Sequence, residues 1–286
     1  MAEEQQGEQT DGQRGDLPAS IEVAWGLRER PGKGPRPGLD LDRIVGAAVR
    51  IASGEGLAAV SMGRLAKELG VSTMSLYRYV AAKDELYVLM QEAALGLPPA
   101  PPAPGTPWRE ALTAWARALR DGSRRHLWAT RLPVGGPPAT PNSVAWMERG
   151  LSALDGSGLD EGSRISVILL ISGFVRSEVG MMADLAEAQA KAGITAEESL
   201  VRYGQLLARF ADAERFPAVT RMLESGVLDT PEDPDYEFVF GMERLLDGIE
   251  ALVRKKHADE QGERGKQDEQ GEQGEQGEQS QQGGAE

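Results

Sequence analysis

Cysteine is absent from this 286-residue sequence, and histidine occurs only twice, as His126 and His257. Disulfide bonds and cysteine-ligated metal sites are therefore excluded. The two histidines offer no acid–base pair, and no glycine-rich phosphate-binding loop follows a predicted strand. We therefore predict that the protein is not an enzyme and that it holds no metal or other cofactor.

Long hydrophobic runs are also lacking. The longest strongly apolar run, residues 165–175, is well short of the ~20 residues that a membrane-spanning helix needs. The first twenty residues are acidic and rich in glutamine, without the apolar centre of a signal peptide. We expect a soluble, cytoplasmic protein with no membrane partner.

Negative charge is in excess, with a formal net charge of −14, but it is unevenly placed. Residues 1–16 hold five acids and one base, and residues 255–286 hold nine acids and four bases. The segment RERPGKGPRPG, residues 28–38, instead has four bases and one acid. A basic arm thus lies beside a charge-balanced segment, and such local asymmetry is compatible with a nucleic-acid partner despite the acidic total.

Breaks in composition divide the chain into four parts. Glu-Gln-Gly repeats after residue 259 carry too little apolar surface to fold, so we expect residues 257–286 to be disordered. We expect the same of residues 1–38, although IEVAWGL at 21–27 is apolar enough to dock as a short segment. Proline-rich residues 96–107 separate two folded parts, 39–95 and 106–256.

Both folded parts show helical periodicity, and no alternating strand pattern competes with it. We therefore predict an all-α fold. In the first part, helices are expected over about 40–53, which ends at Gly54 and Gly56, and then from Ser61, Ser72 and Lys83. Gly70 should end the helix that Ser61 begins.

The second part should contain six or seven further helices. Asn142 is expected to cap one of them, and Thr195 with Glu198 should form a capping box. Residues 165–175 are apolar all round, which predicts a helix buried at the centre. The last helix, 236–253, has two apolar stripes, so it can face both its own core and a partner chain.

One short stretch of the first part, GVSTMSLYRYV at residues 70–80, has the plan of a helix-turn-helix. In that motif the second helix enters the major groove of DNA. With Leu76 and Val80 facing inward, hydroxyls, an arginine and a methionine remain outside, and all of these can contact bases or phosphates. The outward side chains are Thr73, Met74, Ser75, Tyr77, Arg78 and Tyr79.

A helical scaffold or interaction protein without specific DNA binding is the alternative, because glycine-linked helix pairs occur in many helical proteins. A scaffold would explain the second part and the tails as well as a regulator would. It would not explain an outward surface of this kind beside Lys83 and a basic arm, which supply anchors for phosphates. We therefore favour a sequence-specific DNA-binding regulator.

Residues 41–90 also closely resemble, over their whole length, the DNA-binding domain of the tetracycline-repressor-like (TetR) family. The shared features are the alanines of the first helix, a Gly-Leu before the second, the turn Leu-Ala-x-x-Leu-Gly-Val, and Leu-Tyr-x-x-Val with a lysine downstream. WGLRERPGKGPRPG resembles the arm of one branch of the family. FVFGMERLLDGIEALV resembles the closing helix of that branch's regulatory domain.

The resemblance implies a homodimer that binds a palindromic double-stranded DNA operator, usually as a repressor, and is released by a small-molecule effector. The last helix and the one around 163–187 would form the dimer interface, and the helix at 83–97 would carry the motion. Gly63 stands where drug-responsive members have a base-reading arginine, so their operator sequence does not transfer. The DNA-contacting residues that the resemblance implies are Ser61, Met62, Ser72, Thr73, Met74, Ser75, Tyr77, Arg78, Tyr79 and Lys83.

Aromatic and arginine side chains of the second part are candidates for an effector pocket. Aromatic residues on helices are more often core, and Arg176 has Glu178 or Glu187 as an alternative partner to a ligand. The candidates are Trp108, Trp115, Trp128, Arg131, Trp146, Phe174 and Arg176.

His126, beside Leu127 and Trp128, is more often a hydrogen-bonded packing residue than a ligand contact in such a setting. Drug-responsive members of the family hold a tetracycline–magnesium complex with histidines. We therefore predict no response to magnesium-bound tetracycline.

Overall fold

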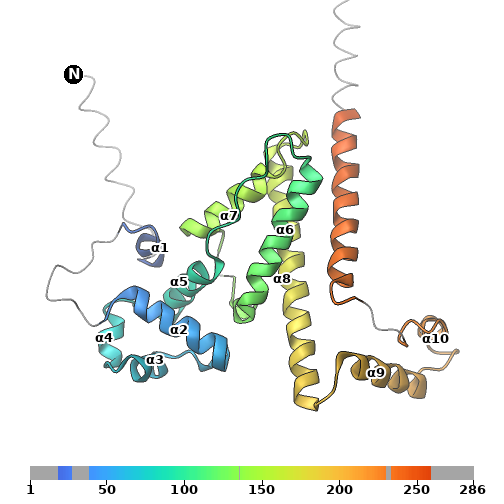
Figure 1. The fold of residues 1–286 in the computed structure, drawn as a ribbon, viewed down its shortest axis with the longest axis horizontal. Coiled ribbons are helices and arrows are strands. Elements are labelled where there is room, and N and C mark those ends of the chain that lie inside the picture. Colours follow the sequence, from blue (N-terminus) through green and yellow to red (C-terminus); the bar gives the residue numbers. More distant parts are fainter. Residues whose placement is uncertain (1–18, 28–38, 135, 230–232, 259–286) are drawn as a thin grey trace, which may run out of the picture.

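The structure, a computed structural model, describes residues 19–27, 39–134, 136–229 and 233–258 (Figure 1). Every regular element in these ranges is a helix, which confirms the predicted all-α class. The basic arm, the acidic start of the chain and the Glu/Gln/Gly tail from residue 259 lie outside the described residues. Residues 19–24 form a helix, so of the two alternatives for the segment 21–27 the structure shows the docked one.

The first domain consists of α2 (Leu41–Glu55), the 3-10 helix η1 (Leu57–Ala59), α3 (Met62–Leu69), α4 (Thr73–Tyr77) and α5 (Lys83–Leu95). Local side-chain caps begin three of these helices, and the two at Ser61 and Ser72 were predicted. Asp40 accepts a hydrogen bond from the Arg43 amide at 2.8 Å, and Ser61 and Ser72 cap α3 and α4 in the same way. The core between the helices includes Ile44, Leu65, Leu76, Val80, Leu86 and Met90, all of them at most 1% exposed.

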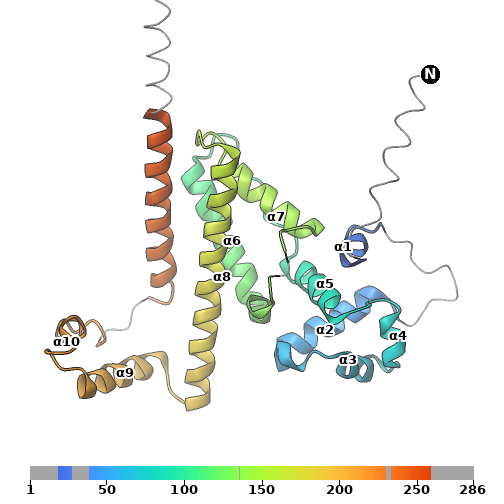
Figure 2. The same cartoon turned by 180° about the vertical axis from the view of Figure 1, so that it is seen from behind.

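The second domain contains α6 (Trp108–Arg125), the 3-10 helix η2 (Leu127–Arg131), α7 (Pro141–Ser152), α8 (Glu161–Ala192), α9 (Ala196–Phe210) and α10 (Pro217–Glu224). A closing helix follows at residues 236–258. It runs antiparallel to α8 and alongside it in both views (Figures 1 and 2). The α9–α10 pair projects from the C-terminal end of α8, away from the first domain.

Two helix starts in the second domain test the predicted caps. Thr195 and Glu198 form the predicted capping box, with hydrogen bonds of 3.1 and 2.9 Å. The prediction for Asn142 is wrong, because Thr140 caps α7 and Pro141 is its first residue. The Asn142 amide instead donates to the Glu92 carbonyl oxygen at 3.0 Å, which ties α7 to α5.

Helix α8 is not buried on all sides, contrary to the prediction for residues 165–175. Val167, Ile168 and Ile171 face the domain core, whereas Leu169 and Leu170 are 60% and 52% exposed. By length and composition α8 is also the one described helix that could cross a membrane. Its inner face, however, packs against α6 and the closing helix, as the core helix of a soluble protein does.

A buried ion pair joins three helices at the lower end of the second domain. Arg120 on α6 and Glu178 on α8 are each 5% exposed, and two hydrogen bonds of 2.7 and 3.1 Å connect them. Arg120 also donates to Asp235 at 2.7 Å and lies over the Phe238 ring. Burial alone would lower the pKa of Arg120, but the hydrogen bonds to both carboxylates outweigh burial, and the net shift is upward.

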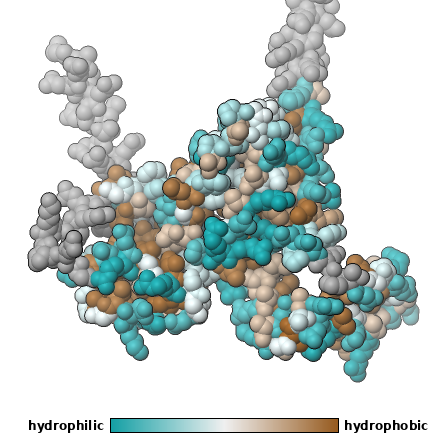
Figure 3. Space-filling model, viewed as in Figure 1, coloured by the Kyte–Doolittle hydropathy of each residue, from teal (hydrophilic) through white to brown (hydrophobic). Residues whose placement is uncertain are grey.

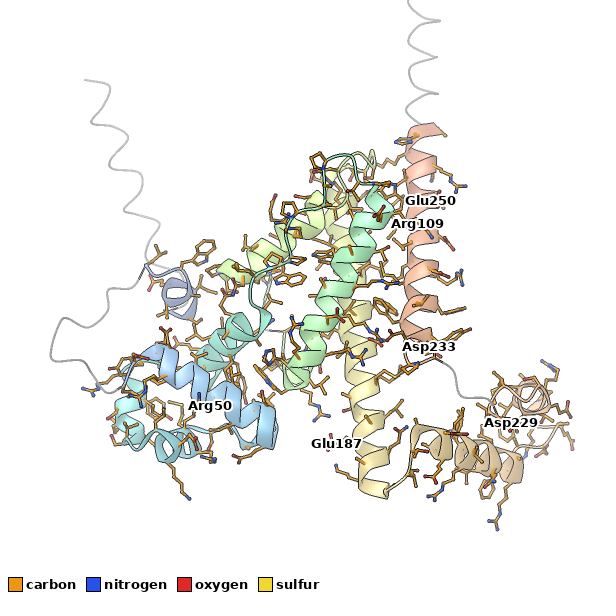
Figure 4. The ribbon with its side chains drawn as sticks, in the orientation of Figure 1. Arg50, Arg109, Glu187, Asp229, Asp233 and Glu250 are labelled. Atoms are coloured by element: carbon orange, nitrogen blue, oxygen red, sulfur yellow. The ribbon has the colours of Figure 1, made fainter. Side chains whose placement is uncertain are left out.

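At the other end of the second domain, more exposed ion pairs also join α6 to the closing helix. Arg109 on α6 donates to Asp247 at 2.6 Å and to Glu250 at 3.2 Å (Figure 4). The hydrogen bond from Arg109 lowers the pKa of Asp247. The closing helix is thus fastened to α6 near both of its ends.

The short helix α1 (Ala19–Ala24) docks against α5 of the first domain. Val23 and Ala24 pack on the core of that domain. The Trp25 indole nitrogen donates to the carbonyl oxygen of Ala139, just before α7, at 2.7 Å. The N-terminal segment therefore touches both domains.

His126 lies between α6 and η2, with its ring 6.0 Å from that of Trp128. Its Nδ1 is buried and has no hydrogen-bond partner among the described residues, so the prediction of a hydrogen-bonded histidine is not supported. Burial and the neighbouring Arg125 charge lower the pKa of His126 below 6.5. Both effects favour the neutral form of the imidazole.

Replacement of Glu178 by alanine should destabilise the protein by about 3–5 kcal/mol, because Arg120 would be left buried without its main partner. Chemical denaturation of the full chain at fixed protein concentration measures the change. The double variant Arg120→Met with Glu178→Leu should recover most of the loss. Glu187→Ala, which breaks an exposed pair on the same helix, should change stability little. Equal losses for Glu178→Ala and Glu187→Ala would contradict this account.

The stability of the protein should also fall as the pH drops below about 6.5, the ordinary pKa of histidine. Because the pKa of His126 is lower in the folded state, the unfolded chain binds a proton first, and acid favours unfolding. His126→Gln should make the free energy of unfolding less dependent on pH between pH 7 and pH 5 than in the parent, as measured by urea titrations. Identical pH dependence in both proteins would show that His126 does not contribute.

Candidate nucleic-acid interface and ligand pocket

Helices α3 and α4 meet in the tight turn that the sequence predicts. Gly70 ends α3 in the left-handed conformation, with φ of 68°, and its amide bonds back to the last turn of α3. The Val71 amide donates to the Ala66 carbonyl oxygen at 3.0 Å. A side chain at position 70 would strain this backbone, so glycine is the residue that the turn requires.

The outer face of α4 is open to solvent. Met74 and Tyr77 are 73% and 46% exposed, and Thr73 and Arg78 are exposed as well. The hydroxyls of Ser72 and Ser75 lie 2.9 Å apart at the start of the helix. The structure therefore brings together, on one face, most of the side chains predicted to read DNA.

Tyr79 departs from that pattern. It is half-buried against the core of the first domain, and its hydroxyl donates to the Leu39 carbonyl oxygen at 3.0 Å. Met62 is likewise partly buried on this core, while Ser61 uses its hydroxyl to accept from the Arg64 amide at 3.1 Å. These three residues therefore take part in packing or capping within the motif.

Two of the positive charges near α4 are free of ion pairs within the described residues, namely those of Arg78 and Lys83. Lys83 begins α5 and lies 5.2 Å from the centre of the Tyr87 ring. Arg64 on α3, by contrast, bonds to Glu55 at 2.7 Å and to Glu68 at 2.8 Å, and these bonds raise the pKa of Arg64. Arg78 and Lys83 thus remain available for phosphates or bases.

Three of the four tryptophans predicted for the pocket of the second domain use their indole nitrogens inside the chain. Trp115 donates to the Trp146 carbonyl oxygen, and Trp146 to the Gly96 carbonyl oxygen, both at 3.1 Å. Trp128 donates to the Ser53 hydroxyl at 3.1 Å and packs in the core of the first domain. All three are buried, so they act first as packing residues.

The two candidate arginines are also engaged. Arg131 is exposed and bonds to Asp184 and, at 3.0 Å, to Glu187. Arg176 donates to the Leu132 carbonyl oxygen. The sequence had suggested Glu178 or Glu187 as its partner, and neither one bonds to it among the described residues. This hydrogen bond could not be predicted from the sequence, because only the fold brings the Leu132 carbonyl near Arg176.

Phe174 stacks on Phe238 of the closing helix, with ring centres 5.9 Å apart. Trp108 instead lines a cavity of about 560 Å³ at the start of α6. Arg149 of α7 lines the same cavity, and sequence reasoning missed it because nothing in its local pattern marks it. Among the described residues, no group of three or more His, Asp or Glu side chains is placed to hold a metal ion.

Comparison with known protein families matches both domains. The family "Bacterial regulatory proteins, tetR family" matches residues 44–90, which span the helix-turn-helix. The family "Tetracyclin repressor-like, C-terminal domain" matches residues 101–253. The second match alone covers more than half of the chain.

Individual relatives agree with these matches. The HTH-type transcriptional repressor DrrR1 of Streptomyces coeruleorubidus is 36% identical over 247 residues, 86% of this chain and 90% of that protein. The tetracycline repressor protein class E of Escherichia coli is 27% identical over 143 residues, 49% of this chain and 67% of that protein.

Solved structures of a Streptomyces coelicolor protein, ActR, share the fold. Its apo form has a TM-score of 0.64 at 29% identity and covers 77% of this chain and 99% of its own. Its complex with actinorhodin has a TM-score of 0.63 and covers 74% of this chain and 95% of its own. Taken with the helix-turn-helix geometry and the two domain matches, these similarities show that the chain belongs to the tetracycline-repressor-like family of bacterial DNA-binding transcriptional regulators.

Proposed function

We propose that this protein is a homodimeric repressor that binds a palindromic operator through α4 of each protomer and leaves the DNA when its second domain binds a small molecule. The observation that carries the proposal is the open face of α4, where hydroxyls, a methionine and an unpaired arginine lie on a helix-turn-helix. Members of the family are regulators and not enzymes. We place this protein in the cytoplasm, with the DNA that it would bind.

Relatives support both halves of the proposal. DrrR1, which aligns over most of its length, is named a transcriptional repressor. ActR has been crystallised with actinorhodin and with (S)-DNPA, so a domain of this fold can bind small molecules. We infer an effector for this chain from that likeness.

On the DNA, each exposed side chain of α4 has a distinct role. Arg78 would bond to a guanine edge or a phosphate, and Met74 and Tyr77 would contact thymine methyl groups. Ser72, Thr73 and Ser75 would donate to bases or phosphates, while Ser61, Met62 and Lys83 flank them along the backbone. Tyr79 supports α4 from behind through its bond to Leu39.

A second copy of the chain is needed to complete the second domain. Between α8 and the closing helix lies an open, mostly apolar groove of about 530 Å³, lined in part by Val167, Leu170, Leu245, Ile249 and Leu252. Leu169 beside it is also exposed. Packing this face on its symmetry mate would bury the apolar stripes in a four-helix interface.

The α9–α10 pair gives independent support for a partner chain. Neither helix has a buried residue, although both are amphipathic. Figure 3 shows apolar surface over this end of the molecule, and large apolar side chains there are exposed: Tyr203, Leu206, Phe210, Phe216 and Val227. Several large apolar side chains exposed at one end of a molecule favour an interaction site there.

The double variant Tyr77→Ala with Arg78→Ala should lose at least about thirtyfold in operator affinity, since each of the two base contacts is worth about 1–3 kcal/mol. Fluorescence anisotropy on the DNA upstream of the protein's own gene, at several salt concentrations and beside a random duplex, measures this. Arg117→Ala, an exposed arginine of the second domain, is the matched control and should bind like the parent. Unchanged binding of a folded double variant would refute the assigned surface.

The double variant Leu170→Glu with Leu252→Glu should convert the dimer into a monomer, because four carboxylates would meet in the apolar interface. Analytical ultracentrifugation gives the mass. Val134→Glu changes an equally apolar residue that is 78% exposed between η2 and α7, and this control should remain a dimer. If the groove variant also stays dimeric with a normal helical spectrum, the interface lies elsewhere.

A further inference from the structure

A cavity of about 560 Å³ lies at the end of the second domain that is remote from α4. Its walls are the proline-rich segment 101–107, the first turns of α6, the last turn of α7 and the turn that follows α7. This volume is in the range of cavities that hold small organic ligands. The groove used for the proposed dimer shares no lining residue with it.

Arg149 brings an uncompensated positive charge to this cavity. The residue is half-buried, and its Nε is buried without a hydrogen-bond partner among the described residues. No carboxylate of the described chain pairs with its guanidinium. Asp155, the acid in the cavity wall, is bonded to Arg164 instead. Because no carboxylate of the described residues neutralises this guanidinium, an anion that enters the cavity would be its first charged partner.

Trp108 supplies a flat apolar wall beside that charge. Trp25, Trp115, Trp128 and Trp146 all donate their indole N–H within the chain. Trp108 makes no such bond to any described residue, so its N–H is free for a ligand. Its ring shares the cavity lining with Pro101, Pro102, Pro104 and Pro107, and such surfaces hold planar rings.

We propose that this cavity is an effector site for a planar organic carboxylic acid, with the carboxylate on Arg149 and the ring between Trp108 and the prolines. A singly charged carboxylate matches the single unpaired guanidinium and can accept two of its N–H bonds. A doubly charged phosphate would leave one charge unbalanced beside Asp155. The effector role rests on the proposed function, whereas the binding does not.

Isothermal titration of the full-length protein with 2-naphthoic acid, a planar monoanion, tests the binding. The parent should bind the acid at least about tenfold more tightly than it binds 2-naphthamide, which has the same shape without the charge. Arg149→Met keeps the apolar stem and should lose about tenfold or more in affinity for the acid. Arg117→Met, on α6 but outside the cavity lining, should bind like the parent.

Thermal unfolding without ligand separates a binding role from a structural one. Because Arg149 has no partner to lose, Arg149→Met should unfold at or above the temperature of the parent. A clear destabilisation would mean that Arg149 supports the fold, and the site would be withdrawn. Equal affinity for acid and amide, no loss in Arg149→Met, or no binding of the acid at millimolar concentration would each overturn the proposal.

Operator release by 2-naphthoic acid, measured in the same samples, tests the effector role separately. Binding of the acid without release of operator DNA would leave the site in place and remove its effector role. Failure of the unliganded parent to bind any operator would instead contradict the proposed function, whatever the titration shows.

Discussion

The position of Trp128 is the constraint on which the rest of this structure depends. This side chain belongs to the second domain by sequence, yet it is buried in the core of the DNA-binding domain and bonds to Ser53 on α2. Leu132, the residue that follows η2, joins the same core. Its carbonyl oxygen accepts a hydrogen bond from Arg176 on α8. The 3-10 helix η2 is therefore held by α2 on one side and by α8 on the other, so neither domain can turn without straining this contact.

Two further contacts restrict the same joint. Asn142 at the start of α7 bonds twice to Glu92 near the end of α5, and Trp25 reaches from α1 to the loop before α7. The contacts of Trp128, Asn142 and Trp25 all involve α2, α5 or the helix α1 that docks on α5. Helices α2 and α5 form the part of the DNA-binding domain on which α3 and α4 pack. Since a packed interface has discrete arrangements and does not deform continuously, a change in the second domain is passed on as a shift of the whole DNA-binding domain.

Most features that depend on neighbours within four residues could be predicted from the sequence, although the cap of α7 was assigned to Asn142 and is Thr140. Features that depend on the fold could not be predicted. The caps at Ser61, Ser72 and Thr195 are local hydrogen bonds, and the turn at Gly70 is a local backbone requirement, so their residue types reveal them. The partners of Arg176 and Tyr79 are backbone carbonyls distant in sequence, and nothing local marks them. Burial of Leu169 and Leu170 was overestimated because an apolar helix face looks the same whether its own core or a second chain covers it.

The proposed carboxylate site lies far from the DNA, but the two helices that wall it end at the joint. Helix α6 begins at the cavity with Trp108 and runs directly into His126 and η2. Helix α7 ends at the cavity with Arg149 and begins beside Asn142, at the contact with α5. A ligand that drew Arg149 toward Trp108 would move the cavity ends of both helices together. Because each helix is rigid, their other ends would shift where Trp128 and Glu92 contact the DNA-binding domain. A ligand that favours one position of these helices would thereby favour one position of the DNA-binding domain, and this couples the two sites.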